Sequence, residues 1–372
     1  SIFITMGRNK NGLDFPLIFS SSGLIMNRSI IVIALFTAAL VGFQSASAEQ
    51  PQSNDIASDV VDTSSWGTRP ESTGMTAEEF IRAEGLDFAA NLVKKNGLNT
   101  FNTPTIASVD NQILTTPNVN VLYTAAAVDT TGGFTLNLPV DDTRLVTAQI
   151  INLDTHTTPV HLNMGGVYTY PAGQFDDHVG ILVRIGVDGK ADAEAQVRVI
   201  ASDLSVEAPN ANPIPNYDLV KLLATRTALK KEFAKTPIDS VGGMVESVDQ
   251  IEDWEKYTLI AAGGWGLSGP ARAAYKLIPG PESLECSTVT VEAPPVNTEA
   301  NGFYSLTIYG KDMFLMTDEY NTVKSDRSGL IEVTVGPSGC EEGAPLYLQA
   351  PKPWNIVLRA YEPDADAFMA QP

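Results

Sequence analysis

The chain has 372 residues, of which 44% are hydrophobic, and a formal net charge of −20. This length favours two domains, the apolar fraction is that of a globular protein, and two cysteines exclude a disulfide-dense scaffold. Because a nucleic-acid backbone needs a basic partner surface, the acidic balance excludes a nucleic-acid-binding protein.

The first 48 residues have the pattern of an export signal. Residues 26–28 are positively charged, residues 29–43 are mostly apolar, and residues 46–48 have the small side chains of a cleavage site. This order predicts a secretory signal peptide at 26–48, preceded at 1–25 by an extension that is not native to the protein. The apolar stretch is too short for a membrane span, so we expect no stable span after cleavage and a periplasmic or secreted protein.

Removing all 48 residues, which include three basic and one acidic side chain, takes the net charge from −20 to −22. A field of this sign keeps a secreted protein soluble. A polar leader follows at 49–75, and we expect it to be flexible.

The first predicted element of the mature chain is a helix. Thr76 and Glu79 have the spacing of a capping box, and apolar residues follow at helical intervals. Gly97, just past two lysines, ends the helix. We expect this helix to open an N-terminal β domain at 76–210.

The remainder of that domain reads as short strands separated by Gly, Pro, Asp and Asn clusters. One further strand is expected after a turn at Asp188-Gly189. The predicted strands are 119–128, 133–138, 145–153, 167–170, 180–187 and 197–200.

The middle of the chain, 211–280, is predicted to be a helical connector. Apolar residues recur at helical spacing over 217–235, and Ser247 to Gln250 is a second capping-box match that predicts a helix through Leu259. Alternation then returns and predicts a C-terminal β-sandwich domain at 281–372. The predicted fold class is mainly β with a helical connector and two β-sandwich or jelly-roll-like domains. The predicted C-terminal strands are 287–292, 303–309, 330–335 and 355–361.

Three segments resemble a pair of bacterial domains. Residues 116–123, Thr-Pro-Asn-Val-Asn-Val-Leu-Tyr, are similar to the Pro-Asn-x-Asp-Thr-Leu-Tyr segment of the family known as domain of unknown function 1254, with Asn120-Val121 in place of Asp-Thr. Residues 302–309 and 350–361 resemble its usual partner, domain of unknown function 1214. The resemblance implies two jelly-roll-like β domains in a cell-envelope protein, and it implies no established chemistry.

All three histidines and several carboxylates occur in one part of the sequence. The residues are Asp154, His156, His161, Asp176 and His178. Imidazole and carboxylate groups at neighbouring strand ends are suitable ligands for zinc or another divalent transition metal. Such a metal would support a hydrolase or lyase. The alternative is that these residues lie in surface loops and at a strand edge.

A second candidate site lies within the segment that carries the resemblance. The amides of Asn118 and Asn120 and the hydroxyl of Tyr123 are suited to bind a small polar or carbohydrate-like ligand. Alternatively, the two amides satisfy the backbone of a turn. A structural or assembly role is the third possibility, and the sequence makes no prediction of oligomeric state.

The two cysteines, Cys286 and Cys340, both fall in the predicted C-terminal domain. Because the signal peptide implies an oxidising compartment, we expect them to form a disulfide, with two free buried thiols as the alternative. In the chain-entropy model, a bridge closing a loop of this length stabilises the fold by about 4 kcal/mol.

Overall fold

The structure is a computed structural model and describes residues 3–8, 14–19, 61–110, 112, 116–233, 235, 244–317 and 321–369. The predicted signal peptide at 26–48 lies outside these residues. Within the described part of the chain, no helix combines the length and the apolarity needed to cross a membrane. Near the N-terminus, β1 (Phe3–Arg8) and β2 (Asp14–Phe19) pair as an antiparallel hairpin.

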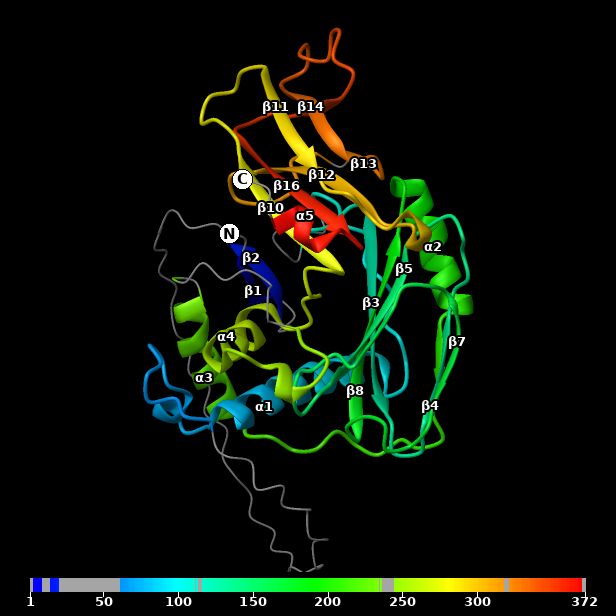
Figure 1. Cartoon of the computed structure of the whole chain (residues 1–372), viewed down its shortest axis with the longest axis vertical. Coiled ribbons are helices and arrows are strands. Elements are labelled where there is room, and N and C mark those ends of the chain that lie inside the picture. Colours follow the sequence, from blue (N-terminus) through cyan, green and yellow to red (C-terminus); the bar gives the residue numbers. More distant parts are fainter. Residues whose placement is uncertain are drawn as a thin grey trace, which may run out of the picture. The chain divides into compact units, whose positions relative to one another are not determined.

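Two sheets share one apolar core in the N-terminal half of the described chain (Figure 1). Leu122, Ile150 and Val183 of the first sheet pack with Leu136 of the second, and the helix α2 (Lys190–Asp203) adds Ile200. This half of the chain is therefore a β-sandwich whose apolar core includes residues of α2. The first sheet has the order β3 (Val121–Asp129), β8 (His178–Gly186), β5 (Val146–Asn152) and β6 (Val160–Leu162), with antiparallel pairs throughout. The second has the order β7 (Gly166–Tyr170), β4 (Phe134–Leu138) and β9 (Ser205–Glu207).

A second sandwich follows in the C-terminal half. Leu306 and Leu358 of one sheet share an apolar core with Val333 of the other, and the short helix α5 (Ala365–Met369) adds Phe368. One sheet has the order β10 (Ala273–Pro279), β16 (Trp354–Tyr361), β12 (Phe303–Gly310) and β13 (Thr322–Ser325). The other has the order β11 (Ser287–Ala293), β14 (Gly329–Gly336) and β15 (Tyr347–Gln349), the last pair being parallel.

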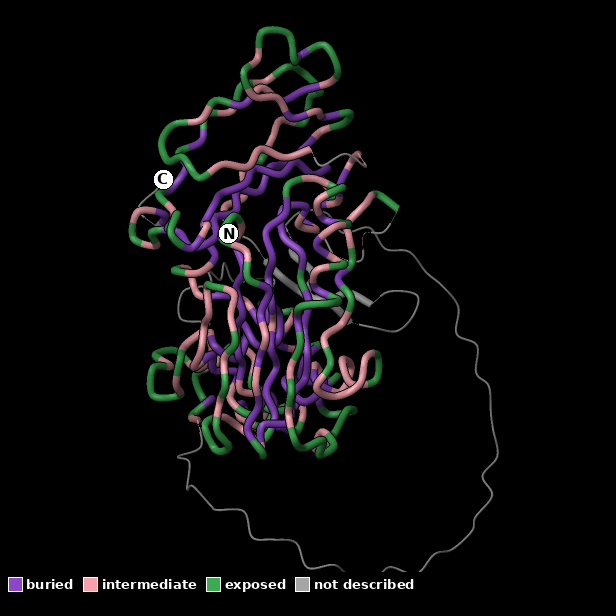
Figure 2. The backbone as a smooth tube through the Cα atoms, turned by 90° about the vertical axis from the view of Figure 1, so that its right-hand side faces the viewer, coloured by how far each residue is buried: buried purple, intermediate pink, exposed green. Residues whose placement is uncertain are grey.

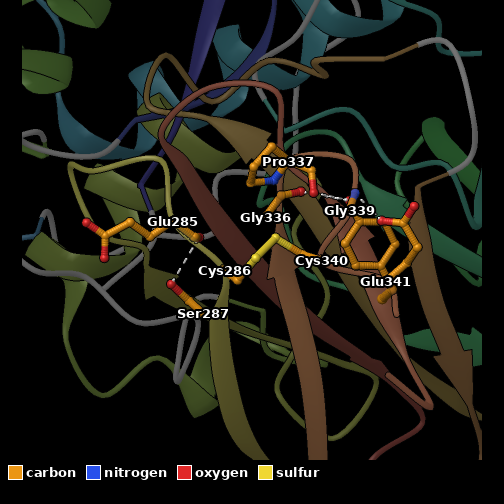
Figure 3. The surroundings of a disulfide bond; sticks show 9 residues. Glu285, Cys286, Ser287, Gly336, Pro337, Gly339, Cys340 and Glu341 are labelled. Carbon is orange, nitrogen blue, oxygen red and sulfur yellow. Dashed lines mark hydrogen bonds between the residues drawn. A yellow bond between two sulfur atoms is a disulfide. The ribbon is translucent and has the colours of Figure 1, made fainter. Parts of the chain in front are cut away.

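A disulfide joins Cys286 and Cys340 beside the paired strands β11 and β14. Figure 3 shows the bond between the residue that precedes β11 and the loop that follows β14. Gly336, the last residue of β14, makes room for it, because a Cβ atom there would lie 2.5 Å from the Cys340 sulfur. The predicted disulfide between the two cysteines is therefore confirmed.

Three helices pack together around a separate apolar cluster: α1 (Ala77–Asn96), α3 (Leu219–Phe233) and α4 (Trp254–Gly264). The predicted capping box of α1 is present, since the Thr76 hydroxyl accepts from the Glu79 amide at 3.2 Å and the Glu79 carboxylate accepts from the Thr76 amide at 2.8 Å. Single 3-10 turns occur at η1 (Pro70–Thr73), η2 (Val248–Gln250) and η3 (Thr298–Ala300).

A buried ionic network ties α1 to α3. The Arg226 guanidinium donates to the two Glu84 carboxylate oxygens at 2.7 and 2.8 Å, and to Asp87 at 2.5 Å. The Tyr217 hydroxyl also donates to Asp87, at 2.7 Å. Each of the three ionic residues is at most 9% exposed, so charge is compensated where water is largely excluded.

The predicted fold class is confirmed, because the protein is mainly β and its two β-sandwiches are separated in the sequence by helices. Two predicted elements are wrong. Residues 197–200, predicted as a strand, belong to α2, where buried Ala193, Gln196 and Ile200 follow helical spacing in an alanine-rich stretch. Ser247 makes no side-chain cap and opens only the 3-10 turn η2. The helix α4 begins six residues later, capped by Asp253, whose carboxylate accepts from the Lys256 amide at 2.9 Å.

Two predicted boundaries also differ from the structure. Residues 61–75, expected within a flexible leader, include η1 and are held in place by bonds such as that between the Thr73 and Thr225 hydroxyls at 2.7 Å. The predicted helical connector at 211–280 ends in the strand β10, which pairs along its whole length with β16. A strand at the edge of a sheet gains its order from this pairing rather than from local propensity.

The two sandwiches meet through the outer faces of their first sheets, within one compact unit. Val121 and Leu145 of the N-terminal sheet pack against Ala273, Phe303 and Tyr361 of the C-terminal sheet. Figure 2 shows that the strands are largely buried while most connecting loops are exposed. Both sheets are therefore covered on two sides where they meet, and polar side chains such as Arg184 and Arg359 are buried on the faces that meet.

Candidate functional site

The outer face of the N-terminal sheet is polar at its centre. Residues directly opposite one another on paired strands point to the same face. Tyr123 of β3 lies opposite Arg184 of β8, and Arg184 lies opposite Thr147 of β5. The adjacent residues Leu122 and Val183 point the other way, into the apolar core. This register groups a phenol, a guanidinium and a hydroxyl on the face turned towards the C-terminal sheet.

The C-terminal sheet has a matching arrangement. Tyr275 of β10 lies opposite Arg359 of β16, and Arg359 lies opposite Ser305 of β12. Leu358 points into the C-terminal core, so Arg359 and its partners point away from that core. Tyr361, two residues after Arg359, shares its face. A phenol, a guanidinium and a hydroxyl are again side by side.

Hydrogen bonds join the two faces. The hydroxyls of Tyr123 and Tyr361 are 3.0 Å apart, and the Asn118 amide nitrogen donates to both, at 3.3 Å to Tyr123. The Asn118 side-chain oxygen is fixed in turn by the backbone amide of Asn120, at 2.8 Å. Tyr123 is 40% exposed, so the group reaches solvent at this residue. We term Asn118, Tyr123, Arg184, Tyr275, Arg359 and Tyr361 the tyrosine–arginine cluster.

Arg359, like Tyr361, has only 1% of its surface exposed. Its Nη2 donates to the Thr116 carbonyl at 2.7 Å, and its guanidinium carbon lies 5.4 Å from the centre of the Tyr309 ring. Its Nη1 has no hydrogen-bond partner. Among the described residues, no carboxylate forms an ion pair with Arg359, so its charge is met by a carbonyl and by tyrosine side chains.

Arg184 is in a similar position, with 5% of its surface exposed. It donates to the Gln149 side-chain oxygen at 3.0 Å and to the Gly266 carbonyl at 3.2 Å. Its guanidinium carbon lies 5.8 Å from the centre of the Tyr123 ring, and its Nε has no partner. In the part of the chain that the structure describes, Arg184 likewise forms no ion pair with an acidic side chain.

Two hydroxyls beside these arginines are also without partners. They are Thr147 Oγ1, opposite Arg184, and Ser305 Oγ, opposite Arg359, and both atoms are buried. Because buried polar groups in proteins are nearly always hydrogen-bonded, unpaired groups gathered in one place need an explanation. Here they belong to the two sheet faces that meet.

The cluster is positively charged at neutral pH. Burial, reinforced by the neighbouring Tyr123 and opposed by the two arginines, raises the pKa of Tyr275 to about 12. Burial likewise raises the pKa of Tyr361 well above its ordinary value. The two phenols therefore stay neutral, whereas an arginine side chain does not deprotonate in proteins.

His161, predicted as a metal ligand, lies on the same face as Arg184, but it contacts a carboxylate that is also bonded to an arginine. It lies opposite Gln149 in the sheet, and its Nε2 is 3.2 Å from a carboxylate oxygen of Glu362. Arg272 donates to the other carboxylate oxygen at 2.8 Å. Burial lowers the pKa of His161, and the hydrogen bond and charge of Glu362 oppose this shift.

The other two histidines are engaged elsewhere. His156 is fully buried, stacks on Trp265 with ring centres 5.2 Å apart, and accepts at Nε2 from the Gly266 amide at 3.0 Å. Burial lowers its pKa to about 3. His178 Nε2 lies 2.9 Å from the Asn212 carbonyl. Each ring thus has a structural partner of its own.

The predicted carboxylate ligands do not complete a metal site either. Asp154 accepts from Arg82 at 2.8 Å, and Asp176 accepts from the Asp154 amide at 2.8 Å. Burial, with the charges of Asp154 and Asp177, raises the pKa of Asp176 to about 6. Over the described ranges, no group of three or more His, Cys, Asp or Glu side chains is placed to hold a metal ion. The expected metal ligands therefore do not come together.

Of the three predicted ligand-binding residues, two belong to the cluster and one does not. Asn118 and Tyr123 meet Tyr361, as described. Asn120 is 1% exposed, and its side-chain oxygen accepts from the Thr322 hydroxyl at 2.8 Å. It therefore fastens the chain to β13 and is unsuited to contact a ligand.

Arg184 and Arg359 were not among the site residues predicted from the sequence. Each interrupts an otherwise apolar strand, as Ile-Leu-Val-Arg184-Ile in β8 and Ile-Val-Leu-Arg359-Ala in β16. A lone charge inside an apolar run is a detectable signal, because arginine is rarely fully buried without a partner. The pairing of the two strands' outer faces is not readable from either segment alone.

A surface pocket of about 210 Å³ lies away from the cluster, between residues 99–104 and the end of α2 with β9. Its lining includes no ionisable side chain. Two of its polar residues support the fold, since Asn99 donates to the Asn210 carbonyl at 2.8 Å and Asn102 accepts from the Ala125 amide at 2.7 Å. This pocket offers less chemistry than the cluster.

Comparison with known proteins identifies a structure with a similar fold but indicates no activity. No family model and no curated protein matches the sequence. The solved structure of the VPA0106 protein from Vibrio parahaemolyticus is similar, with a TM-score of 0.58 and 15% identity over 80% of this chain and 95% of that one. A putative uncharacterised protein from Burkholderia cenocepacia aligns over 80% of this chain and 85% of its own, with 13% identity and a TM-score of 0.40. The first likeness shows a shared fold.

Proposed function

We propose that this protein binds a small polar ligand at the tyrosine–arginine cluster. The observation that carries the proposal is the meeting of Tyr123 and Tyr361, from different sheets, with Asn118 bonded to both. Hydroxyl and amide groups that converge at a partly exposed position are the groups by which proteins orient a polar ligand. The aromatic rings beside them suit a carbohydrate-like ligand as well as a smaller one.

The proposal is supported by where the family-like segments lie. Residues 116–123, which resemble domain of unknown function 1254, supply Asn118 and Tyr123. Residues 350–361, which resemble domain of unknown function 1214, supply Arg359 and Tyr361. We propose membership of that paired family on these segments, and the two of them meet at the cluster.

We also propose an exported protein of the bacterial envelope, periplasmic or secreted. The support is the signal-like stretch at 26–48 together with the disulfide, since such bonds persist in oxidising compartments. N-terminal sequencing of the protein recovered from a periplasmic extract tests this. A mature chain that starts at Glu49 is expected, and an uncleaved chain in the cytoplasm would contradict it.

The ligand proposal is tested by screening the purified protein against neutral sugars, polyols and small polar metabolites, with the melting temperature as the readout. A ligand at 100 times its Kd stabilises the folded state by about 2.7 kcal/mol. We expect at least one ligand to raise the Tm of the wild type and not that of Tyr123→Phe or Asn118→Ala.

Tyr168→Phe is the matched control, because it removes a tyrosine hydroxyl that bonds the Met164 carbonyl at 2.8 Å on the other sheet of the N-terminal sandwich. It should leave the ligand response unchanged. A response that survives both cluster variants, or a screen without any response, would count against binding at this site.

A further inference from the structure

The two buried arginines of the cluster differ from the other guanidiniums that the structure places in the interior. Arg184 and Arg359 are 5% and 1% exposed, and over the described residues neither is paired with a carboxylate. Proteins bury a charge only where a counter-charge or a full set of hydrogen bonds replaces water. Each of these guanidiniums instead keeps one N–H group without a partner, Nε of Arg184 and Nη1 of Arg359.

The acidic residue next to Tyr361 in the sequence is already engaged. Glu362 follows Tyr361 directly, but its two oxygens bond His161 and Arg272. Those bonds and the attached charges outweigh burial and lower the pKa of Glu362, so it is an anion at neutral pH that balances Arg272. Its charge is therefore not available to compensate both cluster arginines.

The remaining polar groups around the arginines are hydroxyls, which can donate. Thr147 and Ser305 lie opposite the two arginines and have buried hydroxyls without partners. Tyr123, Tyr275 and Tyr361 add phenols. Together, these groups make a site rich in donors and carrying positive charge. Its chemical complement is a ligand with negative charge and several acceptor oxygens.

We propose that the cluster recognises a small oxyanion, a carboxylate or phosphate group, held by Arg184 and Arg359 and assisted by the Thr147 and Ser305 hydroxyls. This inference rests on the proposed function and names its ligand class. The planar guanidinium fork matches both groups, because it presents parallel N–H donors to two oxygens. The rest of the ligand would lie towards Tyr123, where the cluster reaches solvent.

The net charge of the protein makes anion binding an informative test. With a net charge of −20, the protein repels anions in general. Because some anions also stabilise proteins by exclusion from the surface, an anion that raises the stability of the wild type but not of the arginine variants is one that binds a local positive site. Replacing sodium chloride by sodium acetate or sodium phosphate, at constant ionic strength and pH 7.5, tests this with about 20 mM of each probe.

We expect acetate or phosphate to raise the Tm of the wild type by several degrees relative to chloride. A response to acetate alone assigns a carboxylate, and a response to phosphate alone assigns a phosphate group. No response to either probe would overturn the inference.

Arg184→Met and Arg359→Met should each weaken binding of the effective anion at least about tenfold, as measured by calorimetric titration. Arg198→Met, which removes an exposed arginine from α2, is the control and should bind as the wild type does. Should one methionine variant fail to fold, Arg359→Lys and Thr147→Val supply milder changes with the same expected direction. Equal anion binding in the wild type and in the folded cluster variants would overturn the inference.

The outcome also separates this inference from the proposed function. A neutral ligand that binds in a Tyr123-dependent manner and is unaffected by Arg184→Met or Arg359→Met would leave the proposed function standing and refute the oxyanion. Failure of neutral and anionic probes alike would refute both.

Discussion

Two regions of this protein bury arginine, and they do so in opposite ways. In the helical region, Arg226 is surrounded by Glu84 and Asp87 and fastens α1 to α3. Between the two sheets, Arg184 and Arg359 face phenols, hydroxyls and carbonyls, and each has an N–H group without a partner. The first arrangement is complete in itself and holds the fold. The second is incomplete within the described chain and is suited to recognise something brought from outside.

The largest effect is expected from removing Arg226, the arginine of the helical network. Arg226→Met leaves two buried carboxylates without their counter-charge, and we expect the free energy of unfolding to fall by about 3–5 kcal/mol. Urea denaturation measures the change, with Arg198→Met as the exposed control, expected within about 0.5 kcal/mol of the wild type. A loss below about 1 kcal/mol would show that the network does not hold the helices.

The second largest effect is expected from removing the disulfide, which lies outside both regions that bury arginine. Replacing Cys286 and Cys340 by alanine should lower the free energy of unfolding by about 2–4 kcal/mol, because the unfolded chain regains the freedom that the bridge removes. The increase in Tm with acetate or phosphate should persist, since the bridge contributes no atom to the cluster. Loss of that response would show that the anion acts through overall stability. Denaturing thiol titration of the unreduced wild type should find no reactive thiol.

The pH dependence of the cluster provides a third comparison. The pKa of Tyr275 is about 12 in the folded protein and near 10 in the unfolded chain, so its stabilising contribution is complete below pH 10. That contribution is lost as the pH rises through 12. Tyr275→Phe should therefore reduce the fall in stability between pH 10 and 12 by up to about 2 kcal/mol. Parallel curves for variant and wild type would contradict a phenol whose pKa is raised in the folded protein.

The smallest expected effect is also the most discriminating. In chloride buffer, Arg359→Met should cost only about 1 kcal/mol, because it leaves the Thr116 carbonyl without a donor but strands no carboxylate. Urea denaturation of this variant alongside Arg226→Met measures the difference. If both variants lost the same stability, Arg359 would be a structural residue like Arg226.

Local patterns in the sequence predicted much of the fold, and the failures have physical causes. The capping box at Thr76 and the apolar runs that became β3, β8, β12 and β16 were readable because each is decided by neighbouring residues. The strand β10 was missed because its order comes from pairing with β16, more than 70 positions further along the chain. Residues 197–200 alternate like a strand, but an alanine-rich context makes them helical.

The candidate site was only half visible for the same reason. Asn118 and Tyr123 could be selected from one segment, because polar side chains there follow a recognisable pattern. Arg184 and Arg359 could not be recognised as site residues from the sequence, because they come together only when two sheets from separate parts of the chain face each other. Histidine and carboxylate proximity in sequence, by contrast, did not translate into a shared site, since each imidazole found a different partner.

The most direct test is crystallographic. Crystals of the mature protein are soaked in selenate and, in parallel, in bromoacetate, and the selenium or bromine atoms are then located by anomalous scattering. Neither cysteine offers a free thiol for bromoacetate to alkylate. We expect a selenium or bromine peak at the tyrosine–arginine cluster, with anion oxygens bonded to Arg184 Nε and Arg359 Nη1. Peaks confined to other parts of the molecule, with both guanidiniums still bonded only to protein, would contradict it.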